Sequence, residues 1–132
     1  MCRMVGIVST NNGAAQAAPL PSWWHLVGAP HALRLQAQTG QVLPDNEPGH
    51  EDSWGIGWFD AGGNPALIRQ TGSAADSAYY VFGAERAAQP GEAMAHTLIG
   101  HLRKASCGAV TSENAHPARA DFGAGAIPLQ KP

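Results

Sequence analysis

Two short segments joined by a turn constrain the fold of this chain more than any other feature. Trp54 to Asp60 and Ala66 to Gln70 are rich in the aromatic and aliphatic residues that strands favour. Between them stand Ala61-Gly62-Gly63-Asn64, residues that are typical of tight turns. The pattern therefore predicts a β-hairpin.

Further strands and helices are predicted on both sides of this hairpin. The expected strands are Arg3–Val8 and His96–Leu102. Helices are expected from Pro21 or Ser22 onward, with a break near Gly28-Ala29-Pro30, and from Asp76 or Ser77 to about Ala88. The expected connections include a turn at Thr10–Gly13 and a surface loop over Gln41–Pro48. With 132 residues, the chain has the size of one domain.

The amino-acid composition limits which binding partners and which cellular compartment are expected for this chain. The net charge is −2 and the Lys and Arg residues are scattered, so neither nucleic acid nor a membrane is expected as a partner. Two cysteines, Cys2 and Cys107, are too few for a disulfide framework and lie in no metal-type spacing. We therefore expect no metal site and a reducing, cytoplasmic location. The sequence shows no leader peptide and no run of about 18 apolar residues.

Cys2 is the strongest candidate for chemistry. Removal of Met1 would make it the N-terminal residue, with a thiol and an α-amine side by side. An α-amine titrates at about 7.7–8.0, so it can take the thiol proton and later return it to a leaving amine. The alternative is that Cys2 is an arbitrary second residue at a frayed terminus.

Three segments, in the right order, resemble the motifs of class II glutamine amidotransferases, which are N-terminal-nucleophile hydrolases. The first is Met1-Cys2-Arg3-Met4-Val5-Gly6. The second, Gly49-His50-Glu51-Asp52-Ser53-Trp54-Gly55-Ile56-Gly57-Trp58-Phe59-Asp60, is similar to the HEDGWGIGWY segment of the small stand-alone, YafJ-like branch. The third joins His101-Leu102-Arg103-Lys104-Ala105-Ser106 and Gly108 to Glu113-Asn114-Ala115-His116-Pro117. It resembles the family's HxRxAT-x-G element and its ENTHP or NAHP element.

The resemblance implies a fold and an activity. The expected fold is α+β, the N-terminal half of an αββα sandwich with mainly antiparallel sheets. Residues 1–119 would be the N-terminal part of the family domain, and residues 120–132 a divergent tail that leaves the domain incomplete. The implied reaction releases ammonia or an amine from glutamine or a γ-glutamyl amide through a cysteine thioester, with a small-molecule substrate and no cofactor.

Site residues follow from the matched motifs. Cys2 would be the nucleophile, and Arg103 would pair the substrate carboxylate, because a planar guanidinium makes two parallel charge-assisted hydrogen bonds. Ser106, where the family usually has threonine, would donate to the substrate or fix Arg103. His116 would lie at the substrate or brace its loop, and Asn114 is expected to brace the loop. Without the motif, Arg103 would be read as a surface arginine at a strand end.

The residues around Trp54 are expected to have structural roles. The His50-Glu51-Asp52 run is expected to form a structural loop, not a metal site. Gly55 and Gly57 would weaken a strand unless another backbone approaches closely, and the N-terminal strand is the expected neighbour. Ser53 departs from the glycine that is common in the branch.

The family's oxyanion element is missing. No His-Asn-Gly sequence occurs in the chain, and residues 120–132 keep no aromatic strand. Loss of one oxyanion donor costs about 10²–10³ in rate, so we expect activity to be impaired by truncation. Two alternatives stay open: a non-catalytic remnant or interaction subunit that needs a protein partner or oligomer, and an unrelated small α+β binding domain.

Overall fold

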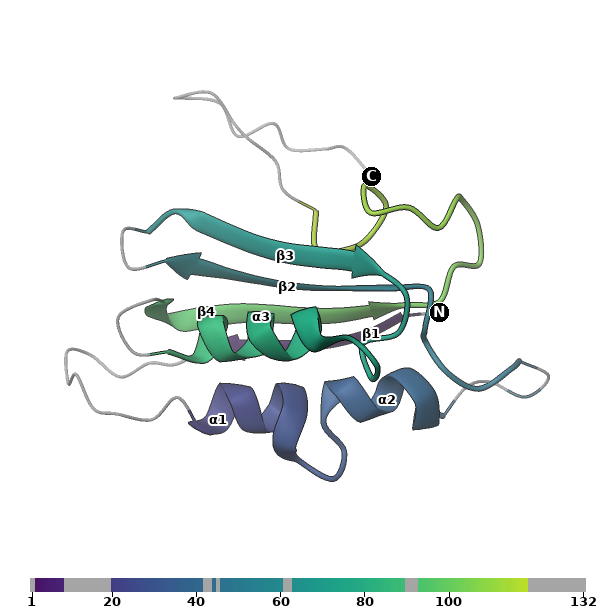
Figure 1. Cartoon of the computed structure of the whole chain (residues 1–132), viewed down its shortest axis with the longest axis horizontal. Helices are drawn as coiled ribbons and strands as arrows, with labels where there is room; N and C mark the ends of the chain where they lie inside the picture. The colour runs from purple at the N-terminus through teal and green to yellow at the C-terminus, as the bar shows by residue number, and fades with distance from the viewer. Residues whose placement is uncertain are drawn as a thin grey trace.

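The computed structural model describes residues 2–8, 20–41, 44, 46–60, 63–89 and 93–118. Its centre is an antiparallel sheet of four strands in the order β1-β4-β2-β3 (Figure 1). The strands are β1 (Cys2–Val8), β2 (Ser53–Asp60), β3 (Pro65–Thr71) and β4 (Ala93–Arg103). All four predicted strands are present, and Ile56 opposite Ile68 shows that β2 and β3 pair as expected. Residues 61–62 and the predicted turn at 10–13 lie outside the described residues.

The helices lie together on one face of the sheet (Figure 1). They are α1 (Leu20–Trp23), the π-helical turn η1 (Trp24–Gly28), α2 (Leu33–Thr39) and α3 (Ala78–Ala88). The predicted break after Gly28 is confirmed, since the chain turns at 29–32 before α2 begins. Ser77 caps α3, accepting the Tyr80 N–H at 3.2 Å, which explains why this predicted helix begins where it does.

The core lies between the helices and this face. Trp54 packs its ring edge-to-face on Tyr80, with ring centres 5.2 Å apart, and both side chains are fully buried. The Tyr80 hydroxyl donates to the Leu26 carbonyl at 3.3 Å, which ties α3 to η1. Burial raises the pKa of this hydroxyl well above its usual value. Gly100 leaves room for Leu26 and Leu33, whose methyl groups would lie 2.7 and 2.8 Å from a Cβ there.

The opposite face of the sheet carries the alternate side chains of each strand. Part of it is crossed by residues 115–118, which follow the loop after β4. The His116 carbonyl lies against Gly55, and the Pro117 ring lies 3.0 Å from the position of a Cβ on Gly57. A close backbone neighbour for these glycines was correctly expected, but its identity was wrong. β4 separates β2 from the N-terminal strand, and the neighbour is the 115–118 segment.

The fold class is therefore α+β with an antiparallel sheet, as expected, and it is consistent with part of an N-terminal-nucleophile fold. One sheet is present among the described residues. The double-sheet sandwich stays a prediction.

Candidate functional site

One row of residues crosses the sheet at the end where β1 begins. In the strand register Cys2 stands opposite Arg103, Arg103 opposite Ser53, and Ser53 opposite Thr71. Directly opposite residues have Cα atoms about 4.5–5.5 Å apart and side chains on the same face. Trp54 points into the helical core, so Ser53 and the rest of this row face the other side. The Cys2 thiol is exposed there.

Arg103 is buried and held by the loop that follows it. Its Nη1 donates to the Ala109 carbonyl at 3.1 Å, and its Nη2 donates to the Cys107 carbonyl at 3.0 Å. Gly108 takes a φ of +77° between these two residues, a conformation that glycine adopts without strain. A guanidinium carries five N–H donors, so donors remain for a ligand after these two bonds. The loop therefore fixes the orientation of the Arg103 guanidinium.

A second contact anchors the same loop from the β2 side. Asp52 Oδ2 accepts the Ala105 N–H at 2.6 Å, and the Asp52 N–H donates to the Arg103 carbonyl at 3.1 Å. These two contacts of Asp52 with backbone are in line with the structural loop expected at residues 50–52. His50 is fully buried, and its N–H donates to the Ala37 carbonyl at 2.6 Å. Burial lowers the pKa of its ring, and the charge of Arg3 lowers it further.

Two further motif residues have different surroundings. Asn114 braces the loop as predicted, with Nδ2 donating to the Ala109 carbonyl at 3.1 Å. Ser106 is exposed, and the groups that fix Arg103 in the described structure are the carbonyls of Cys107 and Ala109. The proposed contact of Ser106 with substrate stays a prediction.

His116 lies beside a histidine that sequence reasoning had not placed in the site. Its ring is 5.2 Å from that of His101, at 67°, on the face that carries Cys2. His101 is buried, and burial, with the charges of His116 and Arg103, lowers its pKa to about 4. It is therefore neutral at pH 7. A signal existed in the sequence: His101 and Arg103 are two apart on a strand, which puts both on one face.

Ser53 is the other residue that sequence reasoning had not placed in the site. It is completely buried beside Arg103, and its Oγ has no hydrogen-bond partner among the described residues. The same holds for His101 Nδ1. The sequence marked Ser53 as a departure from glycine, and the structure places it within strand β2.

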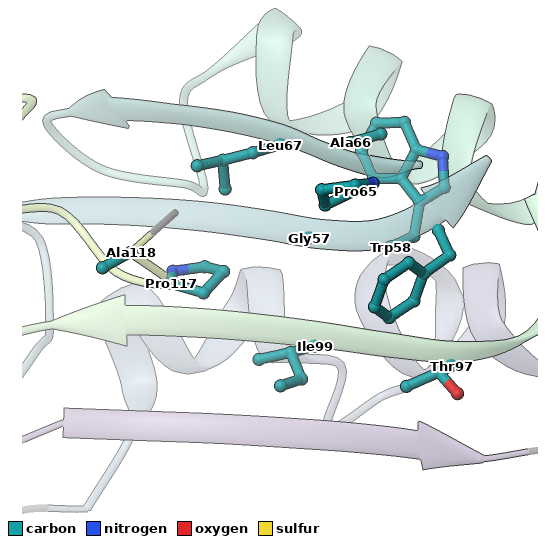
Figure 2. Close-up of a pocket in the computed structure, with 10 residues that line it drawn as sticks. Gly57, Trp58, Pro65, Ala66, Leu67, Thr97, Ile99, Pro117 and Ala118 are labelled. Atoms are coloured by element: carbon teal, nitrogen blue, oxygen red, sulfur yellow. The ribbon is translucent and has the colours of Figure 1, made fainter. Parts of the chain in front are cut away.

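Farther along this face is an apolar hollow of about 180 Å³ (Figure 2). Its lining comes from the three strands β2, β3 and β4 and from the crossing segment: Gly57, Phe59, Leu67, Ile99, Pro117 and Ala118 among others. Ile99 stands four residues before Arg103 on β4, about 13 Å at the usual rise per residue. The hollow is thus separate from the row that contains Cys2.

Comparison with protein families matches residues 36–126 to the family model described as Glutamine amidotransferases class-II. The match spans more than half of the chain and includes the β2–β3 hairpin, Arg103, Ser106 and His116; it begins after Cys2. This chain belongs to the class II glutamine amidotransferases. No curated protein matches it. Within the described ranges, no helix has both the length and the apolar character needed to span a membrane.

Proposed function

We propose that this chain is an amidohydrolase of the glutamine amidotransferase type, which uses Cys2 to release ammonia or an amine from glutamine or a γ-glutamyl amide. The observation that carries the proposal is the pairing of Cys2 with Arg103 at one end of the sheet. It puts Cys2, whose thiol is exposed, one strand away from Arg103, whose guanidinium is held by the loop that follows β4. The HEDSWGIGW segment supports membership of the small stand-alone branch.

The proposed reaction begins when Met1 is removed and the Cys2 α-amine is free. The amine takes the thiol proton, and the thiolate attacks the γ-carbonyl carbon of the substrate. As the C–N bond breaks, the α-ammonium returns a proton to the leaving amine, and a thioester remains on Cys2. Water, deprotonated by the same amine, then hydrolyses the thioester to glutamate. The thiol must stay reduced, which suits a reducing compartment such as the cytoplasm.

Arg103 is the proposed carboxylate clamp, with its remaining N–H groups directed by the loop of Cys107 and Ala109. Ser106 and His116 are proposed to contact substrate from the loops that follow β4. Neutral His101 supports His116 from below by ring packing. The exposure of the Cys2 thiol supports its access to a substrate.

A readout that detects a single covalent event at Cys2 is the most direct test, because the proposed thioester forms on that residue.

The test is covalent labelling with a glutamine analogue that carries an electrophilic diazoketone at the γ position. Intact-mass measurement should first find a chain that lacks Met1, and then one adduct per chain. The adduct should be lost in Cys2→Ala, kept in Cys107→Ala, and blocked by excess glutamine. Cys107 is a matched control, because it is the second exposed thiol of the chain. Retained Met1, or an adduct that needs Cys107, would reject the proposal.

A second candidate function is a non-catalytic interaction subunit. The observation that favours it is the apolar character of the face opposite the helices. Met4 and Val8 on β1 are 70% and 73% exposed, and Phe59 and Ile99 line the hollow on the same face. Sheets of this kind are normally covered by a second layer. Absence of labelling at Cys2, together with concentration-dependent self-association that Met4→Lys abolishes, would favour this function.

A further inference from the structure

The two cysteines of the chain lie at the same end of the sheet, and both are free and exposed. Cys2 is the first residue of β1, and Cys107 comes four positions after Arg103, the last residue of β4. The proposed reaction uses the thiol of Cys2 alone. Cys107 is thus a second accessible thiol at the end of the sheet that carries the proposed nucleophile, and the reaction gives it no role.

Arg103 connects the two cysteines. It stands opposite Cys2 in the strand register, and residues paired in this way carry their side chains on the same face. A strand side chain stands roughly perpendicular to its sheet, and Arg103 Nη2 donates to the Cys107 carbonyl at 3.0 Å. The Cys107 backbone therefore lies above the face that carries the Cys2 thiol. Gly108 lies beside the same guanidinium, since its Cβ position would be 3.6 Å from Arg103 Nη2.

We propose that Cys2 and Cys107 are a peroxide-sensitive thiol pair, which closes reversibly into an intramolecular disulfide. An accessible cysteine beside a second, resolving cysteine is the usual arrangement of redox-sensing sites. Disulfides that form in reducing compartments are commonly transient and sensing. Formation of the bond does not depend on the proposed function, whereas its effect on activity rests on that function.

The segments that carry the two thiols are suited to closure. Residues 106–110 are all exposed, so packing does not hold the Cys107 side chain in place. Cys2 lies at the end of a strand, where local opening is least costly. A disulfide needs Cα atoms about 4.4–6.8 Å apart, and the strand register already brings the neighbouring Arg103 to about 4.5–5.5 Å from Cys2. Closure therefore moves the exposed loop and the strand end and leaves the rest of the sheet in place.

The chemistry balances with a peroxide as the oxidant. The Cys2 thiolate attacks one peroxide oxygen, the O–O bond breaks, and Cys2 becomes a sulfenic acid while the other oxygen leaves as water or an alcohol. The Cys107 thiolate then attacks the Cys2 sulfur, the S–S bond forms, and the hydroxyl group leaves as water. The thiol pair loses two electrons and one peroxide gains them. A dithiol reverses the step by thiol–disulfide exchange.

The disulfide has a direct consequence for the proposed reaction. While the bond is closed, Cys2 has no thiolate and cannot attack a γ-carbonyl carbon. Without a resolving thiol, further peroxide converts a sulfenic acid to a sulfinic acid, which is not reduced back in most proteins. Cys107 therefore gives the nucleophile a reversible inactive state and protects it from permanent oxidation.

The experiment treats the folded chain at low concentration with hydrogen peroxide, alkylates the remaining thiols in denaturant, and measures the intact mass. The reduced chain should take up two alkyl groups and the oxidised chain none, at the mass of a monomer. Peptide mapping should find the Cys2 peptide joined to the Cys107 peptide, and dithiothreitol should restore both thiols. The bond should form about tenfold faster, or more, in the folded chain than in urea, because closing a long loop in an unfolded chain costs entropy.

Two variants at exposed loop positions are the matched controls. Cys107→Ser should let peroxide convert Cys2 to the sulfinic acid, which dithiothreitol does not reverse. Cys107→Ser combined with Val110→Cys keeps two accessible thiols and moves one of them past the Ala109 carbonyl that Arg103 holds. This double variant should form the bond about tenfold more slowly than the parent, because disulfide geometry is specific.

The outcomes separate this inference from the proposed function. A disulfide between two chains, or a bond that forms no faster in the folded chain than in urea, would overturn the thiol pair. Equal rates for the parent and the double variant would overturn it as well. Diazoketone labelling that is lost on oxidation and regained with dithiothreitol supports both conclusions. A reduced chain that forms the disulfide but is never labelled would reject the proposed function and leave the thiol pair standing.

Discussion

The carbonyl oxygen of His116 occupies the space that a Cβ on Gly55 would need. This contact seats the 115–118 segment on the sheet, between the row of Cys2 and Arg103 and the apolar hollow. The missing side chain at position 55 is therefore what allows the loop after β4 to return to the face that carries the thiol.

Gly55→Ala should lower the free energy of unfolding by about 2 kcal/mol, because backbone cannot retreat as a flexible side chain can. It should also displace His116 from His101, which an NMR spectrum of the two rings would report. Gly6→Ala is the control, since nothing lies within 4 Å of its Cβ position on β1. It should stabilise by about 0.5 kcal/mol. If Gly55→Ala and Gly6→Ala change the free energy of unfolding in urea equally, the contact between His116 and Gly55 does not exist in solution.

Asp52→Ala should lower stability by about 1–3 kcal/mol, because it leaves the Ala105 N–H without its carboxylate partner. Asp52→Asn keeps an acceptor oxygen and should lose less. The loop that holds Arg103 should also become more mobile, and hydrogen exchange at residues 105–109 should therefore be faster. Asp76→Ala, at an exposed position whose carboxylate bonds Gln38 at 3.3 Å, should stay within about 0.5 kcal/mol of the parent. If hydrogen exchange at residues 105–109 stays as slow in Asp52→Ala as in the parent, Asp52 does not anchor this loop.

Stability should depend on pH through His101. Its pKa is about 4 in the folded chain against 6.5 for an ordinary histidine. The unfolded chain therefore binds the proton more tightly between these values, and stability is lost as pH falls from 6.5 to 4, by at most about 3 kcal/mol. Burial of His50 acts in the same direction. Urea denaturation from pH 4 to 8 should show a shallower slope in this window for His101→Phe; an unchanged slope would mean that another group titrates.

Ser77→Ala should cost about 1 kcal/mol, because Ser77 accepts the Tyr80 N–H at the start of α3. Ser77→Asp retains an acceptor and adds a favourable charge at the helix N-terminus, so it should match or exceed the parent. Thermal unfolding of the two variants side by side measures the difference. A loss in both would show that the hydrogen bond from the Ser77 hydroxyl to Gln70 Oε1, with 3.3 Å between the two oxygens, matters more than the cap.

The strands and the longest helix could be predicted because their residues have a clear local period. The turn residues after Asp60 marked the hairpin, and Ser77 marked the start of α3. The motif match also placed Cys2 near Arg103, and the register confirms this. The local residue pattern and the motif match were therefore sufficient to predict these elements and the proximity of Cys2 to Arg103.

What could not be predicted depends on contacts between distant segments. Gly55 indicated a close backbone neighbour, but nothing local to it identifies the segment around His116, 61 positions later. Ser53 became part of the candidate site only through the register, since a hydroxyl has no sequence signal for burial. The spacing of His101 from Arg103 indicated a shared face, but nothing in the sequence indicated that His101 is buried there. The carbonyl partners of Arg103 depend on the path of the loop through Gly108, which a motif does not specify.

β1 is an edge strand in the described sheet, with β4 on one side, and Cys2 is its first residue. The alignment of the thiol with Arg103 thus depends on a single ladder at the point where strands open most readily. Each opening of the pairs nearest the terminus would carry the thiol away from its clamp. The opening equilibrium of the first few β1–β4 hydrogen bonds, measurable by amide exchange, then sets an upper limit on the fraction of time for which Cys2 and Arg103 are in register.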